Sequence, residues 1–445
     1  MLPILHQSYW RDEAWSVLLA QKSLSDIFTL TLKDVHPPLF YYLLHFWIKL
    51  FGNYEYVTRV LPFLFHFLLV VAVFSLLLHL LRNWRPSLLG AGAVLMNPFL
   101  LNYAFELKAY SMFAFLTITA LLFFLKRKYI LSSIFLALML FVHNFAFLFF
   151  IPFMVYWVIQ AAKLSNKERL KEGIELFLLP LAVFGFWLSF LWNQWVKVAS
   201  GFWLENSTSS IFVEAFRRYA MGIVEYPSRG MLYNISIVLL FLSFGFWLLE
   251  INKINLKELI VKHKEILFIS LLIFFPFLFT YLVSWFWIPI YHERYLIPAL
   301  PLFIIFIVYS LYKLSRIKNS LMVLVLSFGV AYLLFGWQAS EEILRKTTKP
   351  PINYAVSQVL PQVKEGDIII PKDILNFLET KFYVEKSGNK VPVYMYYPKG
   401  DIPFYLGYGI VIEDKEILRE LPKDKRIWYI ESNGGYILNQ NSTEN

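Results

Sequence analysis

Long apolar runs separated by short polar stretches dominate the chain up to residue 337. Ten of them are candidate membrane spans, at residues 57–81, 86–103, 105–125, 130–142, 145–162, 174–193, 231–250, 265–283, 295–312 and 319–337. A helix needs about 20 apolar residues to cross a bilayer, so the run at 130–142 is short. The stretch 86–125 is too long for one span, and we expect it to turn back near 97–106, where Asn97-Pro98 supplies a break.

The composition leads to the same class. The chain of 445 residues is 58% hydrophobic and 19% aromatic but only 16% charged, whereas about 25% is the usual charged share. A soluble core of this size would leave large apolar patches exposed, and disorder is excluded. The absence of cysteine excludes thiolate catalysis, disulfides and cysteine metal sites. We therefore predict an α-helical polytopic membrane protein.

The positions of the basic residues predict the orientation. If the run 57–81 runs inward, the inner loops carry sixteen Lys and Arg and the outer connections carry six, as the positive-inside rule requires. The net charge of +10 then reports orientation and not a nucleic-acid partner. The same rule favours two short helices at 130–142 and 145–162, broken near His143-Asn144, because one long helix would move eleven of the sixteen basic residues outside.

This topology divides the chain into three parts. Residues 1–56 form an outer-face segment whose stretch 39–51 is expected to lie flat at the interface, residues 57–337 form the transmembrane domain, and residues 338–445 form an extracytoplasmic α/β domain. In the last domain we expect strands at 367–370, 391–397, 408–413 and 426–431 and helices at 374–385 and 415–421. Its simplest role is a structural cap. Because Met1 begins on the outer face, we expect that a first span is missing.

Two acidic groups lie in the N-terminal segment. Asp12 and Glu13 are adjacent, and the simplest interpretation is a helix N-terminus, where carboxylates favour the dipole. Asp34 and His36 precede Pro37-Pro38, which forces an extended conformation, so the two side chains are expected to face the same way. A turn aspartate and a structural histidine are the alternatives.

Two further groups lie at outer ends of predicted spans. Tyr103, Glu106 and Tyr110 are spaced to share one helix face, whereas Lys108 points away and can snorkel to the interface. In the other group, His292, Glu293 and Arg294 border an apolar helix; Arg294 is suited to phosphate, or is an interfacial anchor paired with Glu293. His143 joins them at the helix break, where a structural role is the simplest alternative.

These ionisable groups converge on one predicted face of the membrane, where a reaction on a phosphorylated lipid needs them. Several of the motifs resemble the N-terminal region of family 39-type glycosyltransferases of the GT-C membrane class. That class includes protein O-mannosyltransferases, the aminoarabinose transferase of lipid A and Rgt-type lipopolysaccharide sugar transferases. The motifs are Asp12-Glu13-Ala14-Trp15-Ser16, Asp34-Val35-His36-Pro37-Pro38, Phe51-Gly52-Asn53-Tyr54-Glu55 and Arg59, with further similarity at 106–110 and Arg294-Tyr295.

The resemblance implies a GT-C fold and an enzyme that takes a sugar from a polyprenyl-phosphate carrier. By this resemblance Asp12 corresponds to the catalytic base, Glu13 beside it is a second catalytic candidate, and Arg294 corresponds to a lipid-phosphate ligand. Direct displacement would invert the anomeric centre, whereas a retaining route would need a nucleophilic carboxylate such as Glu13, and both routes remain open. Substrate-binding roles are implied for the other groups, namely Asp34, His36, Glu106, Lys108, Tyr110, His143, His292 and Glu293. Relatives usually carry Glu-x-Arg-x-x-Tyr where this chain has Glu106-Leu107-Lys108-Ala109-Tyr110, and Lys binds phosphate without the bidentate geometry of Arg.

The expected partners are membrane lipid, a polyprenyl-phosphate sugar donor and a glycan, lipid or protein acceptor, at the outer face of the plasma membrane. The sequence specifies no cofactor. His36, His143 and His292 with nearby carboxylates offer a place for a divalent metal ion, although their spacing matches no recognised metal motif, and this alternative stays open. Two alternatives remain open. A transporter or flippase of lipid-linked sugars would place its charges at the midplane and repeat its halves. A non-enzymatic envelope assembly protein would tolerate substitution of Asp12 and Arg294.

Overall fold

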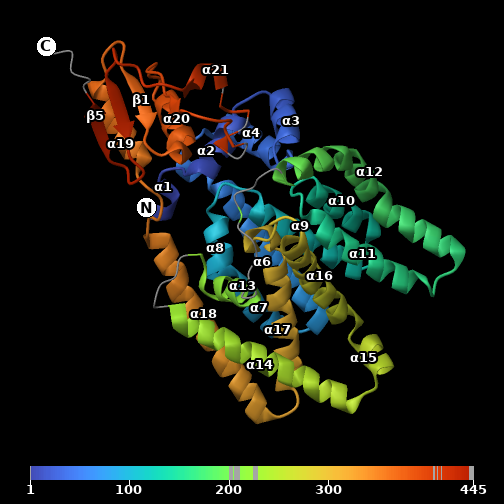
Figure 1. Ribbon diagram of the computed structural model, residues 1–445. Coiled ribbons are helices and arrows are strands. Elements are labelled where there is room, and N and C mark those ends of the chain that lie inside the picture. Colours follow the sequence, from blue (N-terminus) through green and yellow to red (C-terminus); the bar gives the residue numbers. More distant parts are fainter. Residues whose placement is uncertain are drawn as a thin grey trace. The chain divides into compact units, whose positions relative to one another are not determined.

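The computed structural model describes residues 2–199, 204, 211–223, 229–403, 406–407, 409–411 and 413–439. The chain forms two compact units (Figure 1). Unit 1 comprises Met1–Leu61, Glu106–Lys108 and Arg345–Asn445, and unit 2 comprises Pro62–Phe105 and Ala109–Leu344. The N-terminal and C-terminal segments therefore fold together, although the sequence separates them. The division into three parts at residues 56 and 337, and the membrane face of each, remain predictions.

Unit 2 is helical, and each of the ten apolar runs forms a helix or a bent helix pair. Within the described residues, five helices are long and apolar enough to cross a membrane, or six with the bent pair α7 and α8. These are Glu55–Leu81 (α5 Glu55–Thr58, which belongs to unit 1, and α6 Val60–Leu81), α12 Asn166–Ala199, α14 Gly230–Lys253, α16 Lys264–Phe286 and α18 Asn319–Arg345, with the pair α7 Trp84–Leu95 and α8 Pro98–Ala104. Shorter apolar helices are α9 Tyr110–Leu125, α10 Tyr129–Leu140, α11 Ala146–Ala161 and α17 Ala299–Ser315. Other elements in the described part of this unit are α13 Ile211–Met221, α15 Leu256–Lys262 and η2 Glu293–Leu296. The predicted polytopic helical fold is confirmed.

Two predicted breaks occur where the sequence places them. Asn97 caps α8 through its side-chain oxygen, which accepts hydrogen bonds from the N–H groups of Phe99 and Leu100, both at 3.0 Å. Pro98 is the first residue of α8, and the bend from α7 to α8 is 60°. A proline is favourable at the first position of a helix, because an N–H group at that position has no hydrogen-bond partner within the helix, so nothing is lost when proline lacks it. The second break, near His143-Asn144, separates α10 from α11.

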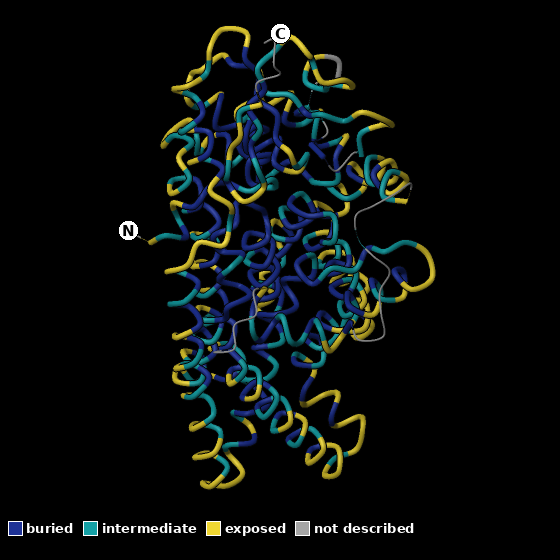
Figure 2. The backbone as a smooth tube through the Cα atoms, turned by 60° about the vertical axis from the view of Figure 1, so that its left-hand side comes forward, coloured by how far each residue is buried: buried dark blue, intermediate teal, exposed yellow. Residues whose placement is uncertain are grey.

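The surface of unit 2 is unusually apolar. Exposed positions recur along its helices (Figure 2). Many of them are large hydrophobic side chains, such as Leu178 at 66%, Phe241 at 71% and Trp337 at 61% exposed. A water-soluble protein buries such side chains, whereas a helix in lipid presents them outward. The exposed faces therefore fit a multi-pass membrane protein.

Unit 1 consists of short helices and two small sheets. Its helices are α1 Pro3–His6, α2 Arg11–Ala20, α3 Leu24–Lys33, α4 Leu39–Phe51, α5, α19 Ile352–Val359, η3 Leu360–Gln362, η4 Ile374–Asn376, α20 Phe377–Lys386 and α21 Glu413–Glu416. Strands β1 Ile368–Pro371, β4 Ile427–Ile430 and β5 Tyr436–Asn439 form one sheet in the order β1-β4-β5, with β1 and β4 parallel and β4 and β5 antiparallel. Strands β2 Met395–Tyr396 and β3 Ile417–Leu418 form a parallel pair. Ile368, Ile370 and Ile427 form the buried core of the larger sheet.

The predicted elements of the C-terminal region agree with the structure in part. The strands expected at 367–370, 391–397 and 426–431 and the helix at 374–385 match β1, β2, β4 and α20. The strand expected at 408–413 is wrong for its described residues, since 409–411 form turns and α21 begins at Glu413; residues 408 and 412 lie outside the described part. The helix expected at 415–421 is also wrong, because β3 begins at Ile417. Residues 417–418 are extended because they pair with β2, and the local sequence pattern of one strand does not reveal a partner that lies elsewhere in the chain.

Candidate functional site

Helix α2 turns its two acidic residues to different surroundings. Consecutive helical residues lie about 100° apart, so adjacent side chains diverge. The side chain of Glu13 has no exposed surface, whereas that of Asp12 is 22% exposed and lies 3.6 Å from Nε of Arg11. Helix α2 therefore presents one accessible carboxylate and buries the other.

Glu13 is held by two cations and by two backbone N–H groups, those of Leu107 and Trp10, and the Trp10 N–H donates to Oε2 at 3.3 Å. Its carboxylate accepts hydrogen bonds from Nε and Nη2 of Arg59 at 3.0 and 2.7 Å, and Nζ of Lys349 lies 2.7 Å away. The N–H of Leu107 also donates to it, at 3.2 Å. Burial alone would raise the pKa of Glu13, but the charges of Arg59 and Lys349 outweigh it and lower the pKa to about 2. Glu13 is therefore an ionised carboxylate in a closed network.

The segment Glu106–Lys108 contacts this network through the Leu107 N–H and belongs to unit 1. The predicted helix face of Tyr103, Glu106 and Tyr110 is wrong, because α8 ends at Ala104 and α9 begins at Tyr110. A tight turn replaces the helix, in which the Lys108 N–H donates to the Glu106 carbonyl at 2.7 Å. Burial lowers the pKa of Lys349, and the charges of Glu13 and Glu106 oppose that shift.

The turn directs Lys108 onto aromatic rings and not toward solvent. Its Nζ lies 4.8 Å from the ring centre of Trp15 and 5.9 Å from that of Tyr41, and the residue is 4% exposed. Such contacts stabilise a buried cation through the ring face. The prediction that Lys108 points away from Glu106 assumed a continuous helix and is therefore wrong as well.

Asp34 and His36 form the pair that the extended Pro37 motif predicts. Nδ1 of His36 lies 2.7 Å from Oδ2 of Asp34, so the two side chains face each other. His36 lies 5.8 Å from Trp15 and 6.3 Å from Tyr41, measured between ring centres. Burial raises the pKa of Tyr41, and the nearby charges of Asp34 and Asp12 raise it further. We call this set the Asp12 cluster: Asp12, Trp15, Asp34, His36, Tyr41 and Lys108.

A second cluster lies in unit 2, on the 3-10 turn η2. His292 accepts the Arg294 N–H through Nδ1 at 3.3 Å, and Glu293 forms an ion pair with Arg218 of α13. The Tyr219 hydroxyl donates to the carbonyls of Glu293 and Leu296 at 3.1 and 3.2 Å. These contacts fix η2, so Glu293 serves as an anchor for Arg218 and η2 presents Arg294.

Aromatic rings surround Arg294. Its guanidinium lies 5.3 Å from the ring centre of Tyr295 and 6.0 Å from that of Tyr110. His143 stacks on Phe113 at 4.8 Å, and its ring centre is 5.8 Å from Tyr295. We call Tyr110, His143, His292, Glu293, Arg294 and Tyr295 the Arg294 cluster.

The eleven candidate residues thus divide between two places. Unit 1 brings together Asp12, Asp34, His36 and Lys108, with Glu13 and Glu106 in the buried network, and unit 2 brings together Tyr110, His143, His292, Glu293 and Arg294. Among the described residues, no group of three or more His, Asp or Glu could hold a metal ion. The role of a metal remains a prediction.

Sequence reasoning missed Lys349 and the ring contacts of Tyr41. Lys349 follows the last span and gives no local signal, because its partner Glu13 lies near the other end of the chain. Trp15 and Arg59 were noticed only as parts of a motif.

Another missed residue is Glu379 of α20, a 3% exposed carboxyl that receives a hydrogen bond from the Arg11 backbone. Burial raises its pKa to about 8, although Arg11 opposes the shift. Because the folded pKa lies above the ordinary value of 4.5, this group should lower stability progressively as pH rises from about 4.5 to about 8.

We therefore expect Glu379→Gln to match the wild type near pH 4, where Glu379 is protonated in both the folded and the unfolded state, and to unfold several degrees higher near pH 9. Several degrees is the change in unfolding midpoint that a few kcal/mol produces. Thermal unfolding of the purified protein at both pH values measures this. Glu420→Gln, at an exposed position, is the control. Parallel profiles for wild type and Glu379→Gln would show that Glu379 is ionised in the folded protein.

The fold and the two clusters define a class: a multi-pass helical membrane protein with a small C-terminal α/β part and ionisable clusters in both units. Within that class, the fold is similar to ArnT from Cupriavidus metallidurans. The structure of ArnT in the apo state has 12% sequence identity and a TM-score of 0.63, over 96% of this chain and 90% of that chain. The structure of ArnT bound to undecaprenyl phosphate has 12% identity and a TM-score of 0.62, over 97% and 90%. No family model and no curated protein sequence matches the chain.

Proposed function

We propose that this protein is a membrane glycosyltransferase of the GT-C class, which transfers a sugar from a polyprenyl-phosphate donor to a hydroxyl group of a glycan, lipid or protein. The observation that carries the proposal is the similarity of its fold, over almost the whole chain, to ArnT, one structure of which is bound to undecaprenyl phosphate. The motif resemblance supports the same class, since that family includes the aminoarabinose transferase of lipid A.

Asp12 is the proposed general base. An acceptor hydroxyl is a poor nucleophile at neutral pH, and a carboxylate within hydrogen-bond reach removes its proton as the new bond forms. Asp12 is the accessible member of the acidic pair. Its charge acts on Tyr41, whose ring packs against Trp15 with 5.1 Å between ring centres, and such rings offer faces on which a sugar can pack. Glu13 has a different proposed role. Its five contacts occupy both oxygens, so it positions α2 against the Glu106–Lys108 turn and does not react.

Asp34 and His36 are proposed to position the acceptor. The Asp34 carboxylate keeps a proton on Nδ1 of His36 and leaves Nε2 to bind a sugar hydroxyl. The leaving group is a lipid phosphate, whose growing negative charge requires cations. Arg294 is proposed for this task, because it is a cation held in place by aromatic rings. Lys108, a cation held by the rings of the Asp12 cluster, is proposed to bind substrate there. The reaction is proposed to occur at the outer face of the plasma membrane.

Comparison of cells with and without the gene tests the proposal, using mass spectrometry of lipids and glycans. We expect a polyprenyl-phosphate sugar to accumulate in the cells without the gene and one glycan to lose that sugar. The purified protein in liposomes should then consume the same lipid with the same acceptor. Translocation of the lipid-linked sugar across the liposome bilayer, without transfer, would instead establish a flippase.

Arg294→Gln is expected to lower kcat/KM for the lipid donor by about 10- to 100-fold, which is the effect of losing a hydrogen bond to a charged group. Arg294→Lys should be intermediate, because Lys keeps the charge but loses the bidentate fork. Initial rates at varied donor concentration measure both variants. Arg82→Gln, at an exposed position, is the control. A donor KM and kcat equal to wild type in Arg294→Gln would exclude Arg294 as the phosphate ligand.

A further inference from the structure

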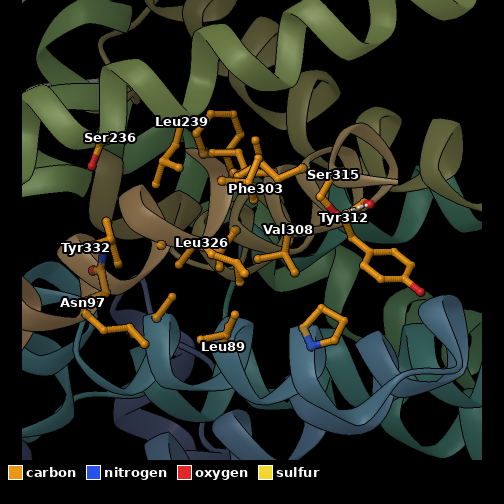
Figure 3. Close-up of a pocket in the computed structure, with 18 of the residues that line it drawn as sticks. Leu89, Asn97, Ser236, Leu239, Phe303, Val308, Tyr312, Ser315, Leu326 and Tyr332 are labelled. Atoms are coloured by element: carbon orange, nitrogen blue, oxygen red, sulfur yellow. Dashed lines mark hydrogen bonds between the residues drawn. The ribbon is translucent and has the colours of Figure 1, made fainter. Parts of the chain in front are cut away.

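Unit 2 contains an apolar groove of about 390 Å³ between helices α7, α14, α17 and α18 (Figure 3). This is within the range of about 300–1,000 Å³ that small-molecule sites occupy. The middle of the groove is apolar, with Leu89, Phe303, Val308 and Leu326 among the side chains that line it. The two ends are polar, and they differ in charge.

The groove follows the whole of α17. Lining residues recur on one face of this helix from Leu300 to Ser315, a distance of about 22 Å at 1.5 Å per residue. Half of a bilayer's hydrocarbon core is about 15 Å thick. The groove is therefore long enough to hold the acyl chain of a lipid from one leaflet along its full length.

Hydrogen bonds mark the two ends. At one end, the side chain of Asn97 donates to the Tyr332 hydroxyl at 3.3 Å, and the lining groups are neutral. At the other end, Asn83 lies 3.5 Å from the Tyr312 hydroxyl, and both Arg85 and Arg316 line the groove. None of the described residues that line it is acidic.

The two arginines are placed as a headgroup site requires. Both are exposed, Arg85 in the first turn of α7 and Arg316 directly after α17, so their guanidinium groups can reach a lipid phosphate at the edge of the hydrocarbon. The apolar length begins directly beside them. This arrangement is complementary to an anionic lipid, since the headgroup would contact the arginines while the tail lies in the apolar part of the groove.

We propose that this groove binds a diacyl phospholipid with an anionic headgroup, whose phosphate contacts Arg85 and Arg316 and whose acyl chain lies along α17. A polyprenyl phosphate held at Arg294 would enter from the opposite end, near Leu300, and would bring its apolar tail to the two arginines. The charge of the groove disfavours that arrangement. The phospholipid comes from the leaflet whose headgroups lie at the arginine end.

Gly329 allows a test that leaves both arginines intact. It lines the groove, and a Cβ atom built on it meets no other atom within 4 Å. A leucine side chain at this position therefore fills the groove without a backbone clash. Gly245 of α14 is a matched control, since it has the same open space but is not among the lining residues.

The test uses the full chain in nanodiscs of phosphatidylcholine that contain a trace of phosphatidylglycerol with a photoreactive acyl chain. We expect crosslinks on α7, α17 and α18 that unlabelled phosphatidylglycerol displaces. One cation near an anionic lipid contributes about fivefold to binding, so Arg85→Gln with Arg316→Gln should raise the half-saturating lipid fraction about 25-fold. Gly329→Leu should abolish the crosslinks.

Control variants separate the groove from the rest of the protein. Gly245→Leu, and Lys126→Gln with Lys128→Gln in another basic loop, should crosslink like the wild type. Displacement by undecaprenyl phosphate but not by phosphatidylglycerol would overturn the proposal and assign the groove to the polyprenyl tail. Equal labelling by a phosphatidylcholine probe, or unchanged labelling in both groove variants, would also overturn it.

Discussion

Asp12→Asn is expected to lower the rate of sugar transfer by about 10²- to 10⁴-fold, which is the usual contribution of a general base. Asparagine has almost the same shape as aspartate but cannot accept the proton of the acceptor hydroxyl. Because Asp12 is partly exposed and Glu13 supplies the buried charge of α2, the substitution should leave the fold intact. The loss should occur in kcat, with the donor KM little changed.

The measurement is the single-turnover rate of the reconstituted protein. Its donor is the polyprenyl-phosphate sugar identified by comparing the lipids of cells with and without the gene. Asp424→Asn, an exposed carboxylate of the same unit, is the matched control and should retain full activity. His36→Gln should lower the rate less than Asp12→Asn, since His36 is proposed to position the acceptor. If Asp12→Asn retains most of the rate and His36→Gln loses it, then the His36–Asp34 pair is the base.

The helical fold was predictable because its signals are local. Ten apolar runs gave ten helical segments, and Asn97-Pro98 and His143-Asn144 gave breaks where polar groups interrupt them. The Asp34–His36 pair was also predictable, since Pro37 restricts the backbone of His36 and two-residue spacing on an extended chain sets the side chains on one side.

The features that the sequence did not reveal depend on contacts distant along the chain. The Glu106–Lys108 segment has the residue spacing of a helix, but it forms a turn. In this turn the Leu107 N–H donates to Glu13 and not to a backbone carbonyl of a helix. Lys349 reaches Glu13 from the far end of the chain. Whether Glu13 is a second catalytic carboxylate or a buried anchor depends on these partners, and no spacing within 1–56 reports them.

Glu13→Gln is expected to destabilise the protein by about 3–5 kcal/mol, because glutamine leaves Arg59 and Lys349 as two buried cations with less compensating charge. The midpoint of thermal unfolding should fall by about 10 °C, given about 2–4 °C per kcal/mol for a domain of this size. Transfer should also fall, since the Glu106–Lys108 turn loses an acceptor for the Leu107 N–H. Glu420→Gln, at an exposed position, should change neither quantity.

The pH dependence distinguishes this anchor from a catalytic carboxylate. The folded pKa of Glu13, about 2, lies below the ordinary 4.5, so its stabilisation is complete above about pH 5 and is lost as pH falls toward 2. The stability gap between wild type and Glu13→Gln should therefore be constant near neutral pH and close in acid. If Glu13→Gln instead abolishes transfer and leaves the unfolding midpoint unchanged, then Glu13 reacts directly. Arg59 and Lys349 would then keep a nucleophilic carboxylate ionised, and the reaction would follow a retaining route with a glycosyl-enzyme intermediate.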